Sequence, residues 1–341
     1  MLIAFWILSS AVALVAIGVA YQKFGGLRDR RLYAEGRFVS IGNRRKLYFF
    51  ERGTGEPFVL FEAGIGATHL NWRKIQDAIA QFTATLSYDR AGLGWSSPSQ
   101  SPRTPSNIAR ELHEALQRAA IKPPFILVGH SFGGLVMRRF ALMFPGEVAG
   151  VVLIDPMRCE EWPPLDPAKQ SQIDLGRKLI RYSLPVAHCG MTRLLVSLLF
   201  RRAGRISDQI AVAAGRHPRH VLGRIKTEVR KMPRAVWPAV AAHWSRPEFY
   251  AGLRRHIQSI PDTVKEMHEA EPIANIPVTV LTPRNASPLA HDQLQRIGDC
   301  TQQVIAPHSE HWIHLDEPEL VIDSIRNMVN AALAGSVAVA D

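Results

Sequence analysis

The feature that most constrains this chain is a short apolar segment that ends in the pattern Gly-x-Ser-x-Gly and leads directly into a second apolar segment. Phe125 to Val128 has the length and composition of a buried strand, and residues 135–141 those of a helix. A serine hydroxyl becomes a good nucleophile only when it is exposed and paired with a base, and a sharp strand-to-helix turn exposes it. The pattern therefore predicts Ser131 as a nucleophile. The two glycines of the motif avoid clashes in this turn, and the backbone N–H of Phe132 can stabilise an oxyanion.

Apolar segments alternate with amphipathic ones on both sides of this turn. We expect strands at residues 37–40, 46–51, 57–62, 83–88, 125–128, 150–154, 276–281 and 302–305, and helices at 72–82, 108–120, 135–141 and 318–333. Almost wholly apolar strands that alternate with helices indicate an α/β fold, with a mostly parallel sheet covered on both faces. The first two strands are separated by Gly42-Asn43, which predicts an antiparallel hairpin.

The alternation of strands and helices is interrupted once. It stops at Asp155-Pro156 and resumes near residue 276, and residues 157–272 are Arg-rich with a helical pattern. We expect residues 37–156 and 273–335 to form one core. The helical block 157–272 is then an insertion over the carboxyl ends of the strands.

Three groups of residues resemble the α/β-hydrolase family, and in particular its lidded branch of esterases, peroxidase-like enzymes, dehalogenases and C–C hydrolases. They are residues 129–134, the turn from Tyr88 to Ser96, and His311 with the segment 314–318. The resemblance implies an α/β-hydrolase fold in which the insertion is a helical cap that shapes the substrate pocket. It also implies a triad in the chain order Ser, acid, His. This chemistry needs no cofactor and no metal.

Three histidines near the C-terminus are candidates for the catalytic base: His308, His311 and His314. The family places the base in a loop after the last strand, before an aromatic residue and a helix opened by an acidic residue and proline. His311 fits this pattern, because Trp312 follows it and Glu317-Pro318 opens the next helix. Asp89 and Arg90, in the turn after the strand at 83–88, are interpreted as structural.

The acid and the second oxyanion donor follow from the same resemblance. No carboxylate directly follows the strand at 276–281, so we assign the acid to Asp155, the position used by dehalogenases, with Asp292 as the alternative. The family supplies its second oxyanion N–H from the loop after the third strand, which here runs from Glu62 to Gly66. We assign this donor to Ile65, as partner of Phe132.

The N-terminal segment from Leu2 to Ala20 contains no charged residue. As a helix it would be about 28 Å long, close to the roughly 30 Å of a bilayer's hydrocarbon core. The alternative is a signal peptide cleaved after Ala20. The positive charges follow the apolar run, in residues 23–31, which predicts an uncleaved single-pass anchor (1–22), a basic tether (23–36) and a cytoplasmic catalytic domain. The three cysteines lack the spacing of a disulfide framework and also favour a reducing compartment.

The net charge of +11 falls mostly within residues 157–272, without a nucleic-acid-binding motif, so no nucleic-acid partner is expected. Within this block, Leu194 to Phe200 followed by Arg201-Arg202 is typical either of a membrane-interface helix or of a buried cap helix. We predict a membrane-anchored serine hydrolase that cleaves an acyl ester, thioester or amide of a small-molecule or lipid-like substrate. The alternatives are a C–C bond hydrolase or peptidase with the same triad, and a non-catalytic binding protein.

Overall fold

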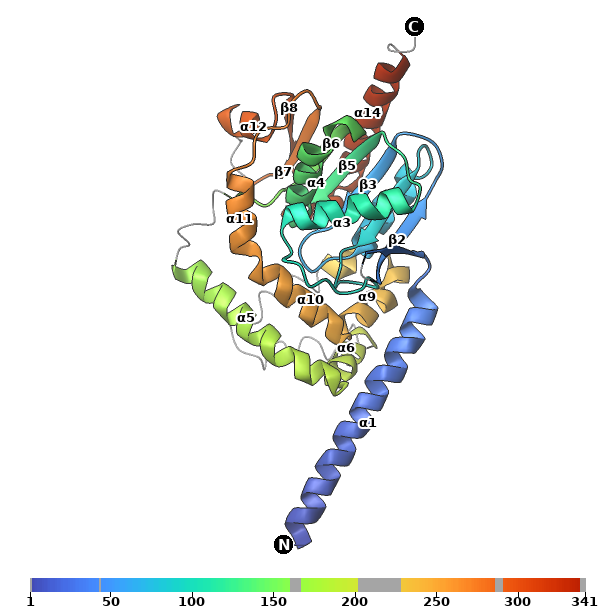
Figure 1. Ribbon diagram of the computed structural model, residues 1–341, viewed down its shortest axis with the longest axis vertical. Helices are drawn as coiled ribbons and strands as arrows, with labels where there is room; N and C mark the ends of the chain where they lie inside the picture. The colour runs from blue at the N-terminus through green and yellow to red at the C-terminus, as the bar shows by residue number, and fades with distance from the viewer. Residues whose placement is uncertain (1, 43, 160–166, 202–227, 286–290, 338–341) are drawn as a thin grey trace. The chain divides into compact units, whose positions relative to one another are not determined.

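A single sheet of eight strands forms the centre of the fold, in the order β1-β2-β4-β3-β5-β6-β7-β8. The computed structural model describes residues 2–42, 44–159, 167–201, 228–285 and 291–337 (Figure 1). The strands are β1 (Arg37–Ile41), β2 (Arg45–Arg52), β3 (Phe58–Glu62), β4 (Thr85–Asp89), β5 (Phe125–His130), β6 (Val148–Ile154), β7 (Val278–Pro283) and β8 (Thr301–Ala306). β1 and β2 form the predicted hairpin, β2 also runs antiparallel to β4, and all other neighbours are parallel.

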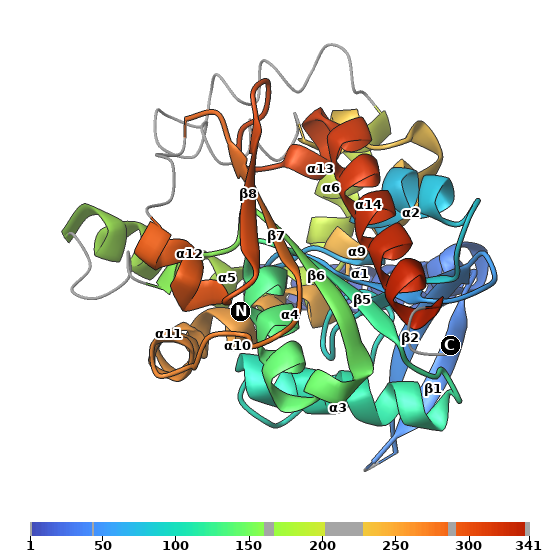
Figure 2. The ribbon, with the colours of Figure 1, turned by 90° about the horizontal axis from the view of Figure 1, so that it is seen from above.

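Helices cover both faces of the sheet (Figure 2). On one face lie α3 (Pro105–Arg118) and α4 (Phe132–Met143), and on the other lie α2 (Arg73–Ile79) and α14 (Pro318–Val337). The packing of β5 on both faces explains why its sequence is apolar throughout. Phe125 and Leu127 pack toward α3 and α4, whereas Ile126 and Val128 pack toward α2 and α14. Because successive side chains of a strand point to opposite faces, a strand covered on both sides has no polar position.

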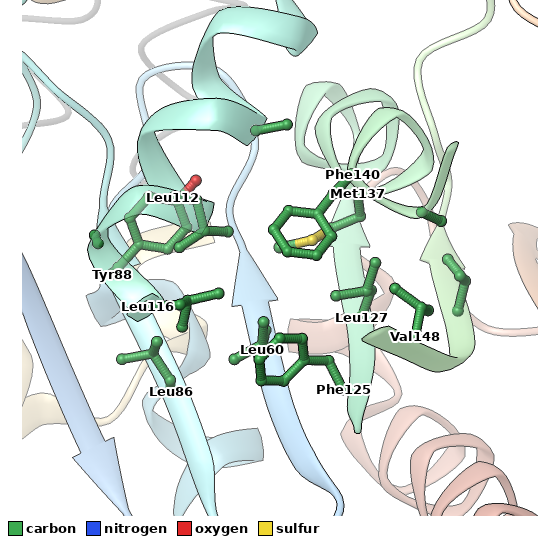
Figure 3. Packing of buried hydrophobic residues seen from close by; sticks show 14 of the residues in the cluster. Leu60, Leu86, Tyr88, Leu112, Leu116, Phe125, Leu127, Met137, Phe140 and Val148 are labelled. Atoms are coloured by element: carbon green, nitrogen blue, oxygen red, sulfur yellow. The ribbon is translucent and has the colours of Figure 1, made fainter. Parts of the chain in front are cut away.

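The cluster beneath α3 and α4 shows how this covering is achieved (Figure 3). Leu112 and Leu116 of α3, together with Met137 and Phe140 of α4, meet the side chains of the central strands. Phe140 is fully buried, and its ring lies edge-on to that of Phe125 at 6.3 Å between centroids. Such packing fixes α3 and α4 against the central strands, and the candidate site lies at the carboxyl ends of these strands.

The predicted α/β fold is therefore confirmed, with small differences at element ends. The helix predicted from Ile108 begins at Pro105, preceded by Thr104, because proline fits the first turn of a helix, where no N–H is needed. The helix predicted over 72–82 is a 3-10 turn η1 (His69–Trp72) followed by α2. Within the described residues of 157–272, the structure is helical: α5 (Pro167–His188), α6 (Met191–Arg201), η4 (Arg234–Val236), α9 (Trp237–Trp244), α10 (Pro247–Gln258) and α11 (Ile260–His268).

The chain divides into two compact units whose limits differ from the predicted domains. The larger unit comprises residues 36–165 and 255–341, and so includes α11, whose Ile260, Val264 and Met267 pack with Leu135 of α4. The smaller unit comprises residues 1–35 and 166–254. Its helix α1 (Leu2–Tyr33) continues through most of the segment predicted as a tether. This helix is long and apolar enough to cross a membrane, a property it shares with signal sequences.

Candidate active site

The loops that follow β3, β5, β6 and β8 carry the residues predicted to act together. Ser131 follows β5, Asp155 follows β6, and His311 lies in the loop between β8 and the short helix α13 (Ile313–Asp316). Ile65 lies in the loop after β3. Because these strands are parallel, their carboxyl ends lie along one edge of the sheet. The fold thus gathers residues that are up to 246 positions apart in the sequence near one edge.

Ser131 occupies a strained turn between β5 and α4. Its backbone angles are φ 54° and ψ −121°, outside the usual regions for a residue with a side chain. A Cβ at Gly129 would lie 2.5 Å from the carbonyl oxygen of Gly133, and one at Gly133 would lie 2.3 Å from the carbonyl oxygen of Glu62. Both approaches are sterically forbidden, so the motif glycines are needed where the sequence predicts them.

The backbone of Ser131 is tied to the end of β6, beside Asp155. The N–H of Ser131 donates to the carbonyl oxygen of Ile154 at 3.0 Å, and its own carbonyl oxygen accepts from the N–H of Met157 at 3.1 Å. Asp155 has φ 38°, and its N–H donates to the carbonyl oxygen of Leu281 in β7 at 2.8 Å. These bonds fix the nucleophile turn and the candidate acid in one frame.

His311 and Asp155 form the central contact of the site. The Nδ1 atom of His311 lies 2.6 Å from Oδ2 of Asp155, and the two side chains are 37% and 18% exposed. Asp155 is thus sheltered while the imidazole can still meet a substrate. Because Nδ1 donates to the carboxylate, Nε2 on the opposite side of the ring is the nitrogen left to accept a proton.

Two further histidine rings flank His311. The Nε2 atom of His130 lies 2.9 Å from the carbonyl oxygen of His311, and the two rings are 4.7 Å apart between centroids. His130 immediately precedes Ser131, so this bond joins the base-bearing loop to the nucleophile turn. The ring of His314 lies 4.4 Å from that of His130 and 4.8 Å from that of Trp72.

Burial keeps both flanking rings neutral. It lowers the pKa of His130 well below its usual value, and the neighbouring His314 and His311 lower it further. Burial, followed by the influence of His311, lowers the pKa of His314 to about 3. A positive charge that forms on His311 would therefore face uncharged imidazoles at neutral pH.

The loop after β3 lies against the start of α4. Ile65 and Phe132 pack in the same apolar cluster, together with Val136. The first N–H groups of a helix have no acceptor within that helix, which leaves the N–H of Phe132 available to a ligand. The two predicted oxyanion donors thus belong to neighbouring residues.

A buried ion pair, not predicted from the sequence, holds this loop from behind. The Nη1 atom of Arg90 donates to Oε1 of Glu62 at 2.8 Å and to the carbonyl oxygen of Ala63 at 2.6 Å. Its Nη2 atom donates to the carbonyl oxygen of Gly64 at 2.5 Å. The second carboxylate oxygen of Glu62 accepts from the hydroxyl of Tyr88. Burial raises the pKa of Glu62, an effect that Arg90 opposes, and burial followed by the charge of Glu62 raises the pKa of Tyr88 well above its usual value.

The structure thus pairs Asp155 with His311, ties the backbone of Ser131 to the residues on either side of Asp155, and packs Ile65 with Phe132. The alternative acid, Asp292, lies in α12 (His291–Ile297), and its side chain is outside the described part of the chain. A charged Glu62 at the end of an otherwise apolar strand was the available sign of the ion pair that the sequence analysis missed. Among the described residues, no group of three or more His, Cys, Asp or Glu side chains is placed to hold a metal ion.

Comparison with known proteins is consistent with this geometry. The model of the alpha/beta hydrolase family matches residues 59–324, which is more than half of the chain. A (lyso)-N-acylphosphatidylethanolamine lipase of Bos taurus is 30% identical over 147 residues, covering 40% of this chain and 41% of the lipase. An uncharacterized protein of Bacillus subtilis strain 168, YqjL, is 33% identical over 105 residues, covering 31% of this chain and 42% of that protein. The chain thus spans less than half the length of these curated relatives.

A solved structure extends the likeness beyond the matched segments. A thermophilic esterase from Thermogutta terrifontis superposes with a TM-score of 0.57 at 18% identity, covering 87% of this chain and 99% of the esterase. At this identity the likeness concerns the fold. Taken with the family match over residues 59–324, it supports one conclusion: the chain belongs to the alpha/beta hydrolase family.

Proposed function

We propose that this protein is a membrane-anchored serine hydrolase that cleaves acyl esters through an acyl-enzyme. The observation that carries the proposal is the 2.6 Å contact between His311 and Asp155, next to a half-buried serine held in a strained turn. A serine in this position argues against the chemistry of dehalogenases and epoxide hydrolases, which use a carboxylate nucleophile.

In the proposed reaction, Nε2 of His311 accepts the proton of the Ser131 hydroxyl as its oxygen attacks the acyl carbonyl. Asp155 holds the imidazole in the required tautomer and stabilises the imidazolium. The N–H groups of Phe132 and Ile65 bind the oxyanion. Collapse of the tetrahedral intermediate breaks the ester bond, and His311 returns the proton to the departing alcohol. Water, activated by the same histidine, then releases the acid.

The proposed substrate class is lipophilic esters. The Bos taurus relative is named as a lipase of N-acylphosphatidylethanolamine and its lyso form. The most apolar part of the N-terminal helix is not buried by the described rest of the chain, and it would anchor the protein to a lipid phase. The positive charges of residues 23–31 follow the uncharged part of this helix, and by the positive-inside rule they favour a cytoplasmic catalytic domain.

An active-site probe tests the hydrolase proposal directly. A fluorophosphonate should label the intact full-length protein, and replacement of the nucleophile by Ser131→Ala should abolish the labelling. Turnover of a short p-nitrophenyl ester should be lost in the same variant. Absence of labelling in the unmodified protein, or equal labelling of the variant, contradicts the proposal and favours a non-catalytic binding protein of this fold.

A further inference from the structure

The helix α6 buries a charged side chain and exposes large apolar ones, the reverse of the pattern expected for a helix of a protein surrounded by water. It buries Arg193, which is only 7% exposed, together with Thr192 and Val196. Its outward face is apolar and is formed by Met191, Leu194, Leu195, Leu198 and Leu199, which are 37–51% exposed. In an aqueous setting this arrangement leaves five large apolar side chains about half exposed to water, which is unfavourable. The same face is stable if its surroundings are apolar.

The preceding helix α5 exposes an apolar face as well. Leu175, Leu179, Tyr182 and Val186 are 40–67% exposed. At 100° per residue, these four positions fall within about 60° of one another on the helix surface. The exposed Arg177 lies on the opposite side of α5. The nine exposed side chains of α5 and α6 together form what we call the elbow surface.

The turn between these helices contacts α1 where the uncharged segment of α1 ends. A Cβ at Gly18 would lie 2.2 Å from the carbonyl oxygen of Cys189, and one at Gly190 would lie 2.6 Å from the carbonyl oxygen of Gly18. The two backbones therefore touch. Residues 2–17 extend beyond this contact for roughly 24 Å, at 1.5 Å per residue (Figure 1). If these residues span a membrane, the elbow lies at the membrane surface.

A buried polar clamp fixes the elbow at this depth. The Nη1 atom of Arg193 in α6 lies 2.5 Å from Oδ2 of Asp29, and its Nε lies 3.1 Å from Oε1 of Gln22, both in α1. These partners belong to the polar part of α1, immediately after the uncharged segment. The clamp joins α6 to α1 at the height where bilayer hydrocarbon gives way to headgroups, and it accounts for the buried arginine of α6.

We propose that the elbow surface is a second membrane contact, lying in the interface beside the α1 span, with its apolar side chains among the lipid acyl chains. The occupant of this surface is the bilayer itself. The inference rests on the proposed role of α1 as an anchor. Amphipathic helices bind lipid in this way, with the apolar face immersed by about 5–10 Å.

Site-specific fluorescence in vesicles tests this placement. The full-length protein, with Cys189 and Cys300 replaced by alanine, receives one cysteine at a time and carries an environment-sensitive dye. It is then reconstituted in phosphatidylcholine and phosphatidylglycerol vesicles that contain doxyl-labelled lipid. At Leu179→Cys and Leu195→Cys we expect a blue shift and quenching. At Arg177→Cys, on the opposite side of α5, and at Asp77→Cys, in α2, we expect the emission of dye in water.

A cysteine in the span separates the failure of this proposal from failure of the anchor. If a dye at Ile7→Cys is quenched while those at positions 179 and 195 behave like the dye at position 177, the elbow surface does not touch lipid and the proposal is wrong. If the dye at position 7 also behaves as in water, both the anchor and the elbow contact are wrong. The parent protein without an added cysteine gives the labelling blank.

A kinetic comparison uses the same surface without a dye. In the variant Leu179→Glu, Leu195→Glu, Leu198→Glu, we expect KM for an ester embedded in vesicles to rise, while turnover of a soluble p-nitrophenyl ester stays unchanged. Loss of both activities would show that the triple glutamate variant is misfolded, which a lowered unfolding temperature would confirm. The triple alanine variant at the same positions would then be used in its place. Equal kinetics for the vesicle ester in the parent and the folded variant would contradict the proposal.

Discussion

Asp155 is the residue on which the proposed mechanism can be tested most sharply. Its carboxylate fixes the proton of His311 on Nδ1, so Asp155→Asn should leave the geometry in place with the wrong tautomer. For a serine triad this change lowers kcat by about 10⁴. The measurement is single-turnover acylation by a p-nitrophenyl ester. The matched variant Asp292→Asn should retain its rate, and the reverse result would assign the acid to Asp292.

Arg90 should affect the rate without touching the substrate. It binds the carbonyl oxygen of Gly64, and in a trans peptide the N–H of the next residue, Ile65, points the opposite way. Arg90 thereby orients one proposed oxyanion donor. Loss of one such donor lowers kcat about 10²–10³-fold. We expect kcat to fall by this order in the double variant Arg90→Met, Glu62→Gln, while KM changes little. The second substitution is included because Arg90→Met alone would leave the buried charge of Glu62 without a partner.

A second arginine gives the control for this prediction. Arg45 forms an ion pair with Glu111 at 2.5 Å, whereas Arg90 binds Glu62 and the carbonyl groups of the oxyanion loop. The variant Arg45→Met should change the unfolding temperature and leave kcat unaltered. If the Arg90 double variant changes only the unfolding temperature, the arginine serves the fold alone and has no positioning role.

At the scale of the elements, the nucleophile turn should tolerate no side chain at Gly133. The Cβ introduced by Gly133→Ala would lie 2.3 Å from the carbonyl oxygen of Glu62. Relief of this clash must move either α4 or the oxyanion loop, at a cost of about 1–3 kcal/mol. We expect lower stability to urea and loss of fluorophosphonate labelling. Gly146→Ala is the matched control, because its Cβ would meet nothing within 4 Å, and an equal effect of the two changes would contradict the prediction.

The buried His314 of the short helix α13 should make stability depend on pH. His314 has a pKa of about 3 in the folded protein and about 6.5 when unfolded. Between these values the unfolded chain binds a proton that the folded chain does not. The contribution of neutral His314 to the free energy of unfolding is therefore complete above pH 6.5. It is lost at up to about 1.4 kcal/mol per pH unit as the pH falls toward 3. The variant His314→Gln should show a shallower acid dependence in urea titrations, and identical slopes would refute the assignment.

The elements that could be predicted from the sequence are those whose apolar residues pack in the core around the sheet. The run Phe125–Val128 and the motif after it gave the central strand, the turn and the glycine positions. The Glu62–Arg90 pair was missed, because the two residues are 28 positions apart and meet only through the parallel pairing of β3 with β4. For Leu194 to Phe200 the sequence left a membrane-interface helix and a buried cap helix open, since an amphipathic pattern does not tell whether its apolar face meets protein or lipid.

At the scale of the whole molecule, the two compact units divide the proposed work. The larger unit holds the residues proposed as nucleophile, base, acid and oxyanion donors, all near the carboxyl ends of strands of one sheet. The smaller unit holds the apolar α1 and the elbow surface. In the proposed function, the loops of the sheet thus carry out the chemistry. The helices α1, α5 and α6 provide access to lipophilic substrate.

This division predicts that the N-terminal segment stays on the mature protein. The turn between α5 and α6 touches Gly18, and Arg193 pairs with Asp29, so cleavage after Ala20 would remove part of a packed helix pair. We expect the protein to remain in the membrane pellet after alkaline carbonate extraction, with a mass that includes residues 2–20. A secreted or soluble chain beginning at Tyr21 would instead identify the segment as a signal peptide. That result would remove the anchor while leaving the triad of the larger unit intact, because none of the residues proposed for the chemistry lies in the smaller unit.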